Sequence, residues 1–368
     1  MKEGRVKRIL EAMKANDIPQ MLVSSPASIF YLTGKWISPG ERMITLYLNT
    51  KGEQKFIVNE LFPINEDLGV DILWYNDTMN PIDILDKIID HEEVLGIDKD
   101  WKAHFLIQLL DRNSAKKFVN GSPIVDRVRM RKDDEEIALM KEASRINDIV
   151  VEKAIKSLKE GMTEKEVVEV LGKGYAEYGC QGYSFEPIVA FAANAADPHA
   201  ESGEQKLEKG MGVLIDTGCR KDYYCSDMTR CVFFGEPTEH QKEIFNTVLE
   251  ANKKAIDMIK PGVRFCDIDK AARDVIENKG YGKYFTHRTG HSIGIETHDF
   301  GDVGSTNTDE VKPGMIFSVE PGIYLQGDMG VRIEDLVLVT EDGCERLNHL
   351  NKELVVIKSV SYTHLRAH

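Results

Sequence analysis

The chain has 368 residues, 42% of them hydrophobic, so it is long enough for more than one domain and apolar enough to form buried cores. Its formal net charge of −14 argues against a nucleic-acid-binding surface, and no segment approaches the roughly 18 apolar residues of a membrane span. The charged N-terminus lacks the apolar run of a signal peptide, and the six cysteines show no C-x-x-C spacing. We therefore expect a cytoplasmic protein with free thiols and with neither a nucleic-acid nor a membrane partner.

The first 125 residues are predicted to form a small α/β domain. A helix is expected over 4–16, and helical segments follow Pro81 and Trp101. The expected strands are 20–24, 43–48, 55–58, 71–75 and 94–97. The turn residues at 49–52 predict a hairpin between the second and third strands. Alternation of strands and helices favours a mixed sheet covered by helices, and the domain is expected to end near Gly121.

A second domain is predicted over 126–358, and it opens with a long helix from Asp133 to about Gly161. Acidic residues in the first turn suit the positive end of the helix dipole, and apolar residues then recur at a helical period. The last residues, 359–368, resemble a translated sequencing adapter. We expect them to be a non-native tail without a part in function.

The second domain contains an internal repeat. Its first half reads as a long helix, K-E-G-M-T-E-K-E-V at 159–167, and a second helix; its second half repeats this order around K-P-G-V-R-F-C-D-I at 260–268. Each half continues into a strand, a turn and a returning strand, and Asp216 and Glu320 on the first strands are 104 residues apart. A two-fold arrangement would bring both hairpins to one central site. Chance similarity of two helix–hairpin units is the alternative.

Five potential metal ligands lie in these strands and turns. They are Asp216 in I-D-T-G, Asp227 in S-D-M-T-R, His291 in G-H-S-I-G, Glu320 in V-E-P-G and Glu334 in R-I-E-D. Burying unpaired carboxylates is costly, so four of them have reason to meet only around a cation. Oxygen ligands with one imidazole suit a pair of divalent ions such as Mn²⁺ or Co²⁺, which make water nucleophilic at neutral pH. The set predicts a two-metal hydrolase, although each residue alone could be an ordinary turn or surface residue.

These motifs, in this order, resemble the creatinase/prolidase/methionine aminopeptidase family with its pita-bread fold. The resemblance covers residues 4–357 and includes S-P-A-S-I-F-Y-L-T-G at 25–34, which is similar to the N-terminal domain of the creatinase and prolidase branches. V-R-I-E-D and N-H-L-N-K-E-L at 348–354 are similar to bacterial Xaa-Pro dipeptidases and aminopeptidases P. The resemblance implies an α+β chain, in which a small N-terminal α/β domain precedes a pseudo-two-fold pita-bread catalytic domain.

The resemblance also implies a role for each ligand. Asp216 would chelate one ion, Asp227 and Glu334 would bridge both ions, and His291 and Glu320 would complete the second. A hydroxide that bridges the metals would be the nucleophile, with Glu320 as the proton acceptor.

Four further residues fall on family positions and would serve the substrate. His199 and His298 would hydrogen-bond the scissile amide and the tetrahedral intermediate. His287 would be catalytic or would support the ligand histidine. Arg332 lies two residues before Glu334, which on a strand places both on one face. Its fork would grip a substrate carboxylate, or it would merely neutralise excess carboxylates.

The implied activity is a dinuclear metallopeptidase that hydrolyses the amide bond before proline in Xaa-Pro dipeptides. Mn²⁺ is the expected metal, and Co²⁺ or Zn²⁺ also suit these ligands. The alternative is an aminopeptidase P, which releases the first residue from longer Xaa-Pro peptides. A creatinase-like amidinohydrolase and a non-enzymatic binding module are disfavoured because the metal set is complete. Relatives also imply a homodimer.

Overall fold

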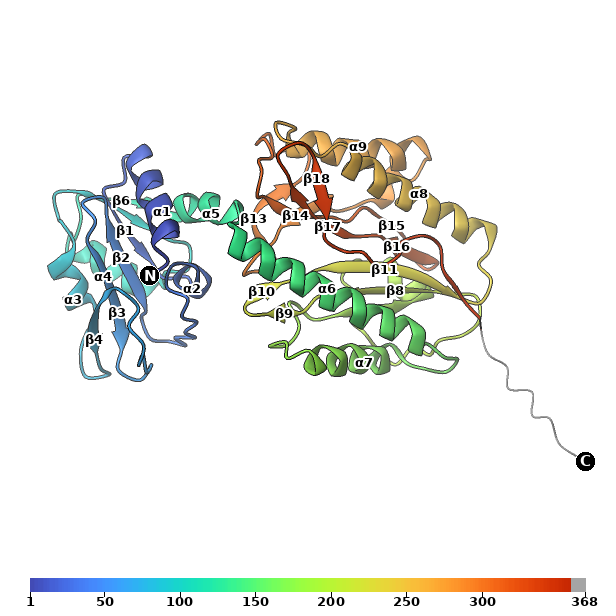
Figure 1. Cartoon of the computed structure of the whole chain (residues 1–368), viewed down its shortest axis with the longest axis horizontal. Coiled ribbons are helices and arrows are strands. Elements are labelled where there is room, and N and C mark those ends of the chain that lie inside the picture. The colour runs from blue at the N-terminus through green and yellow to red at the C-terminus, as the bar shows by residue number, and fades with distance from the viewer. Residues whose placement is uncertain (359–368) are drawn as a thin grey trace, which may run out of the picture. The chain divides into compact units, whose positions relative to one another are not determined.

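The computed structural model describes residues 1–358 and divides into two compact units, 1–129 and 130–358 (Figure 1). The predicted non-native tail, 359–368, lies outside the described residues. The predicted division after residue 125 falls inside helix α5 (Ser122–Met130).

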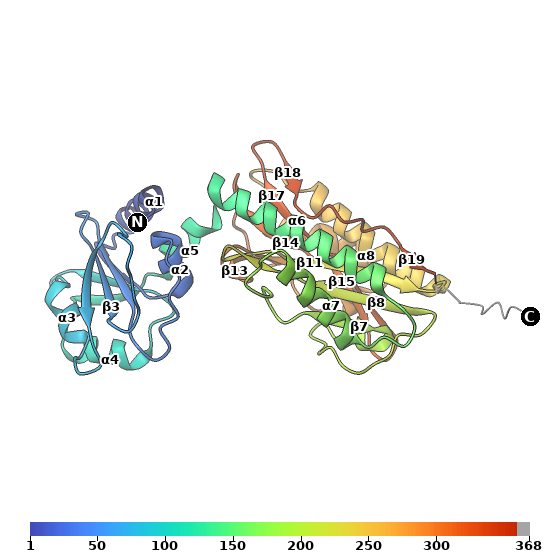
Figure 2. The same ribbon diagram turned by 60° about the horizontal axis from the view of Figure 1, so that its bottom comes forward.

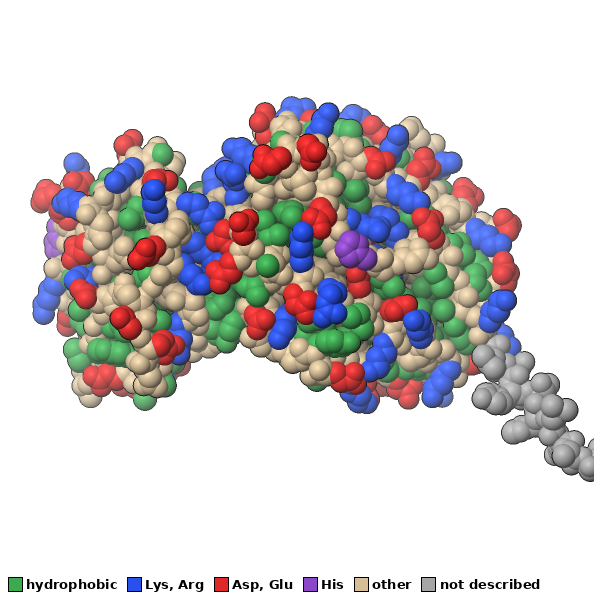
Figure 3. All heavy atoms as spheres, viewed as in Figure 1, with side chains coloured by type: hydrophobic (Ala, Val, Ile, Leu, Met, Phe, Trp, Pro, Cys, Tyr) green, Lys and Arg blue, Asp and Glu red, His purple; other side chains and the backbone are tan. Residues whose placement is uncertain are grey.

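None of the helices in the described part is long and apolar enough to cross a membrane. Acidic and basic side chains are interspersed over each unit on the face seen in Figure 3.

The N-terminal unit is built on the mixed sheet that the alternation of strands and helices predicts. Its order is β4–β3–β2–β1–β5–β6; β2 pairs antiparallel with both β1 and β3, and the other neighbours are parallel. The strands are β1 (Gln20–Val23), β2 (Thr45–Asn49), β3 (Gln54–Asn59), β4 (Asp71–Tyr75), β5 (Val94–Ile97) and β6 (Lys117–Asn120). Apolar side chains of α3 (Ile82–Ile88) and α4 (Ala103–Asp111) pack on one face of the sheet. Helices α1 (Glu3–Ala15) and α2 (Pro26–Thr33) lie on the other side (Figure 2).

The first half of the second unit packs two helices on a four-stranded sheet. The long helix α6 (Asp134–Ser157) begins at an Asp133 cap, and α7 (Glu164–Glu177) begins at a Thr163 cap. Both contribute to one apolar cluster with the sheet β19–β11–β8–β7. The strands are β7 (Ile188–Phe191), β8 (Met211–Thr217), β11 (Met228–Phe234) and β19 (Val356–Ile357), with the small hairpin β9 (Arg220–Lys221) and β10 (Tyr224–Cys225) between β8 and β11.

The second half repeats this plan with a five-stranded sheet. Helices α8 (Glu239–Asp257) and α9 (Phe265–Asn278) pack on β13–β12–β14–β17–β18 through a second apolar cluster. Its strands are β12 (Gly290–Ser292), β13 (Asp299–Val303), β14 (Ile316–Val319), β17 (Asp335–Val339) and β18 (Cys344–Arg346). The shorter elements are the pair β15 (Gly322–Leu325) and β16 (Met329–Arg332) and the turns η1 (Ala192–Ala196) and η2 (Gly282–Tyr284). Figure 1 shows α8 and α9 along one side of the strands and α7 along the opposite side.

The repeat seen in the sequence is a repeat of structure, which confirms the predicted pseudo-two-fold architecture. Gly161 and Gly262 both have positive φ values, 81° and 88°, which favour glycine at these turns. The N–H of each donates to the carbonyl of a later loop, at Leu207 and Val311 respectively. The same backbone contact therefore recurs at the start of the second helix of each half.

Candidate active site

The five predicted ligands line a single cleft of about 1150 Å³ in the second unit. Asp216 lies on β8 and Asp227 directly before β11, whereas His291 lies on β12. Glu320 directly follows β14, and Glu334 lies between β16 and β17. The other residues singled out from the sequence also line this cleft: His199, His287, His298 and Arg332.

Three of the predicted ligands form a compact buried cluster. Candidate ligand atoms of Asp227, His291 and Glu334 all lie within 4.8 Å of one another. His291 Nε2 is 3.7 Å from Asp227 Oδ2 and 3.4 Å from Glu320 Oε1. Asp227 Oδ1 and Glu334 Oε1 are buried and have no hydrogen-bond donor among residues 1–358. Because buried carboxylate oxygens need a positive or donating partner, these residues fit a divalent cation.

The electrostatics of the cluster favour a cation as well. Burial raises the pKa of Asp227 well above its usual range, and repulsion from Glu334 and Asp216 adds to the rise. Burial raises the pKa of Glu334 in the same way, with Glu320 and Asp216 as the repelling neighbours. Burial lowers the pKa of His291 to about 3, so its imidazole is neutral and available as a ligand. A cation among these groups would stabilise the ionised carboxylates and reverse their shifts.

Hydroxyl groups that the sequence analysis did not single out orient the carboxylates. Thr229 Oγ1 donates to Glu334 Oε2 at 2.7 Å, and Ser318 Oγ donates to Glu320 Oε1 at 3.3 Å. The Glu334 N–H also donates to the Thr229 carbonyl at 3.2 Å, which joins the two halves of the unit beside the candidate ligands. Thr229 follows Asp227 by two residues, so strand alternation offered a signal for it.

Arg332 is held by groups of the protein itself. It is 3% exposed, and its Nη2 donates to Asp216 Oδ2 at 2.5 Å. Nη1 donates to the Tyr324 hydroxyl at 2.7 Å, and Nε donates to Thr229 Oγ1 at 3.2 Å. The guanidinium therefore lies among the candidate ligands, where it neutralises Asp216. Nothing in the sequence indicated that Tyr324 contacts Arg332, apart from its position four residues after Glu320.

The three other histidines that line the cleft, His199, His287 and His298, have different surroundings. His287 Nε2 lies 2.8 Å from the Tyr324 hydroxyl, and burial followed by the charge of Arg332 lowers the pKa of His287 to about 4. The ring of His298 packs edge-on against the ring of His291, with centroids 4.2 Å apart. His199 is an exposed residue of the cleft wall. His298 thus contacts a predicted ligand, whereas His287 reaches Arg332 through a tyrosine.

A buried carboxylate anchors the segment that carries His199. Glu164, in the first turn of α7, is 0% exposed and accepts hydrogen bonds from the N–H groups of Phe191 and Gly203, both at 2.8 Å. It also accepts from Asn194 Nδ2 at 3.0 Å. These donors lie at both ends of segment 191–203. Glu164 lies in the segment 159–167, which precedes the expected second helix, and no local pattern in the sequence encodes its distant donors.

Comparison with known proteins covers both units. The family model for the creatinase/prolidase N-terminal domain matches residues 5–131, and the model for metallopeptidase family M24 matches residues 138–341. An uncharacterized peptidase of Staphylococcus saprophyticus is 39% identical over 359 residues, which span 95% of this chain and 100% of the relative. A solved dipeptidase from Pyrococcus horikoshii is 34% identical with a TM-score of 0.89, covering 96% of this chain and 100% of that chain. A solved Xaa-Pro dipeptidase from Bacillus anthracis is 31% identical with a TM-score of 0.88, covering 97% and 100%. The resemblance inferred from the motifs is confirmed: this chain belongs to metallopeptidase family M24 and carries a creatinase/prolidase-type N-terminal domain.

Proposed function

We propose that this metallopeptidase hydrolyses the amide bond before proline in Xaa-Pro dipeptides. The observation that carries the proposal is the pair of buried carboxylate oxygens, on Asp227 and Glu334, that lack donors beside the neutral imidazole of His291. Similarity over nearly the whole chain to an Xaa-Pro dipeptidase supports the substrate class.

The proposed cofactor is a pair of divalent ions. They would be held by Asp216, Asp227, His291, Glu320 and Glu334. Mn²⁺ is the first candidate, with Co²⁺ and Zn²⁺ as alternatives for these oxygen and nitrogen donors. When bound, such ions activate water and polarise the scissile carbonyl. The homodimer implied by the resemblance and the cytoplasmic location expected from the sequence stay predictions.

The side chains of the cleft would bind the substrate and move protons. Glu320 takes the proton of the attacking water and returns it to the proline nitrogen, which has no N–H of its own. His199 and His298 donate hydrogen bonds to the substrate carbonyl and to the tetrahedral intermediate. His287 orients the Tyr324 hydroxyl, and that hydroxyl accepts from Arg332.

Arg332 would bind the carboxylate of the substrate's proline. Of its five N–H donors, one contacts each of Asp216, Tyr324 and Thr229, and a further Nη1 contact reaches the Pro198 carbonyl at 3.5 Å. A two-pronged grip therefore needs the remaining Nη2 donor together with the Nη1 donor that now makes this long contact. The contact with Asp216 meanwhile keeps the guanidinium beside the ligands.

The size of the cleft favours a second candidate, an aminopeptidase P that releases the first residue from longer Xaa-Pro peptides. The cleft volume of about 1150 Å³ exceeds the roughly 300–1,000 Å³ of ordinary small-molecule pockets. Its wall includes Lys165, Val168 and Glu169 on α7 as well as the metal-ligand candidates. Such a cleft has room for residues that follow the proline.

Hydrolysis of an Xaa-Pro dipeptide and of the matching Xaa-Pro-Yaa tripeptide distinguishes the two candidates. Metal-stripped protein should be inactive and should cleave the dipeptide once Mn²⁺ is added. The Mn²⁺-loaded protein should cleave the dipeptide faster than the tripeptide. Preference for the tripeptide would assign the aminopeptidase activity instead. Failure of the metal-loaded protein to cleave either peptide would contradict both. As a matched variant, Arg332→Lys should raise KM for the dipeptide more than for the tripeptide, whose carboxylate lies one residue further on.

A further inference from the structure

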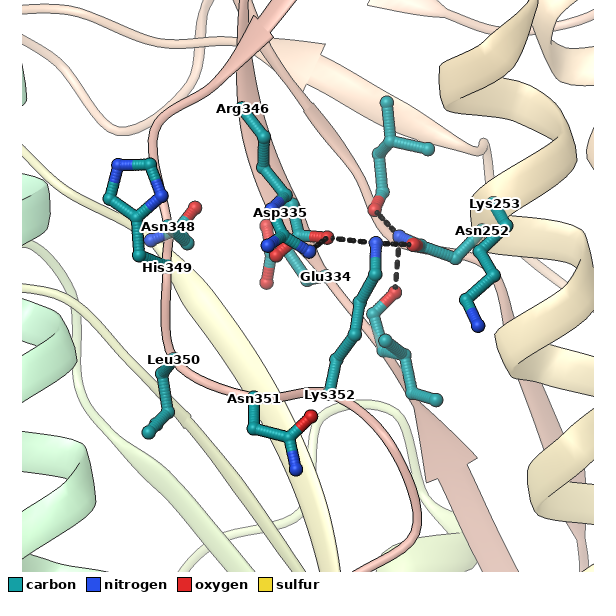
Figure 4. A network of polar contacts seen from close by, with 12 residues as sticks. Asn252, Lys253, Glu334, Asp335, Arg346, Asn348, His349, Leu350, Asn351 and Lys352 are labelled. Atoms are coloured by element: carbon teal, nitrogen blue, oxygen red, sulfur yellow. Dashed lines mark hydrogen bonds and ion pairs between the residues drawn. The ribbon is translucent and has the colours of Figure 1, made fainter.

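Asn252, on α8, contacts the backbone beside two of the proposed ligands. It is 0% exposed, and its Nδ2 donates to the Val319 carbonyl at 2.8 Å and to the Ile333 carbonyl at 3.2 Å (Figure 4). Val319 directly precedes Glu320, and Ile333 directly precedes Glu334. One side-chain amide therefore binds the backbone directly before each of the two proposed carboxylate ligands of the second half.

Lys352 fixes the orientation of this amide. Its Nζ donates to Asn252 Oδ1 at 2.5 Å and to Asp335 Oδ2 at 2.5 Å. In Figure 4, Lys352 extends from the loop after β18 to a place between Asn252 and Asp335. An ammonium group has donors and no acceptor, so the amide oxygen must face Lys352 and the amide nitrogen must face the two carbonyls. The flipped amide would place its N–H₂ against a cation and its oxygen against two carbonyl oxygens.

The first half has a counterpart. Asn147, on α6, precedes Asn252 by 105 residues and is also 0% exposed. Its Nδ2 donates to the Thr217 carbonyl at 2.9 Å, directly after Asp216, and its Oδ1 accepts from the Tyr175 hydroxyl at 2.6 Å. Each half therefore has a helix asparagine whose oxygen is fixed by a second donor and whose nitrogen holds a strand beside a ligand. Recurrence at nearly the spacing of the repeat argues for a shared role.

We propose that Asn252, oriented by Lys352, is a positioning residue that sets the separation of the Glu320 and Glu334 carboxylates for the metal ions. Ligand atoms must be placed to within roughly 0.2 Å for tight metal binding, and these two carboxylates lie on separate segments, one after β14 and one between β16 and β17. A single amide bonded to both segments limits their relative movement. The inference rests on the proposed metal site and does not depend on which peptide is cleaved.

The test is titration of the metal-stripped full chain with Mn²⁺ by calorimetry. Asn252→Asp keeps the shape of the side chain and the partner of Lys352 but replaces the donor with an oxygen that repels both carbonyls. We expect Mn²⁺ affinity to fall by about 10–100-fold, as it does when groups supporting metal ligands are replaced. Thr247→Val is the matched control, because its buried hydroxyl donates within the same helix, to the Glu243 carbonyl at 2.8 Å. This control should bind Mn²⁺ as the unmodified protein does, even where its melting temperature falls.

Lys352→Met provides a second route to the same answer if Asn252→Asp does not fold. It leaves Asn252 in place but removes the group that fixes the amide, so Mn²⁺ affinity should fall by a smaller factor. Folded variants that bind Mn²⁺ with unchanged affinity would overturn the positioning role and leave the metal site intact. If the unmodified protein binds neither Mn²⁺, Co²⁺ nor Zn²⁺, the proposed metal site fails, and the positioning role fails with it.

Discussion

Glu334 and Asp335 are neighbours in the chain, both are buried, and their surroundings are opposite. Burial would raise the pKa of Asp335, but the cations of Arg230, Lys352 and Arg346 outweigh it and hold that pKa below its usual value. Arg230 Nη2 and Lys352 Nζ lie 2.8 Å and 2.5 Å from its two oxygens. Glu334 instead has a pKa well above its usual range and one oxygen without a donor among the described residues.

Asp335 is a carboxylate that stabilises the structure, whereas Glu334 is a carboxylate that is available to a ligand. Both side chains are almost fully buried, at 1% and 0% exposed, so burial alone does not distinguish them. The distinguishing feature is direct contact with a cation of the protein. Asp335 forms ion pairs with Arg230 and Lys352, whereas Glu334 forms none among the described residues and is proposed to bind a metal ion.

The largest expected effect comes from neutralising the unmatched carboxylate. Glu334→Gln should reduce the proposed Xaa-Pro hydrolysis by more than about 100-fold, because it removes a proposed ligand and not merely a group that supports one. The measurement is kcat/KM with saturating Mn²⁺. An exposed control of the same chemistry, Glu341→Gln, should retain full activity. Activity within a few-fold of normal in Glu334→Gln would remove this residue from the site.

Neutralising Asp335, the carboxylate that pairs with cations of the protein, should mainly lower the free energy of unfolding. Asp335→Asn leaves the buried charges of Arg230 and Lys352 with a neutral partner, and we expect a loss of about 3–5 kcal/mol in the free energy of unfolding. Denaturant unfolding of the metal-stripped protein measures this loss directly and excludes any contribution from metal binding. A loss below 1 kcal/mol would mean that the cations find other partners.

A third buried carboxylate, Glu164, tests the intermediate case in which the partners are neutral N–H groups. Glu164→Gln should cost about 1–3 kcal/mol, since one oxygen becomes a donor that faces another donor. Activity should fall as well, because segment 191–203 carries His199. Glu166→Gln, an exposed change in the same helical turn, is the control. In a His199→Ala background the activity effect of Glu164→Gln should disappear; a persistent effect would show that it does not act through His199.

The sequence was sufficient to predict that the five candidate ligands meet in one cleft, because each lies in a short local motif and the family's order then connected the motifs. Strands of the first domain were predictable for a similar reason, since apolar runs ended in turn residues. Strand β6 was not predicted, because K-F-V-N has only two apolar residues and lies half-buried at the sheet edge. The pairing of Arg332 with Asp216 and of Lys352 with Asn252 joins residues 116 and 100 positions apart. No local pattern encodes such distant partners. Only the folded chain shows which buried carboxylates pair with a cation of the protein.

The most direct test of the central claim is the stability of metal-stripped protein with and without Mn²⁺, for the unmodified chain and for Glu334→Gln. Without metal, Glu334→Gln should be at least as stable as the unmodified chain, because it removes a carboxyl whose ionisation burial and the neighbouring carboxylates make costly. Mn²⁺ at about 100 times its dissociation constant should stabilise the unmodified chain by about 2.7 kcal/mol and should stabilise the variant far less. Equal stabilisation of both proteins, with Glu334→Gln less stable in the absence of metal, would contradict the claim that Glu334 is held for a cation.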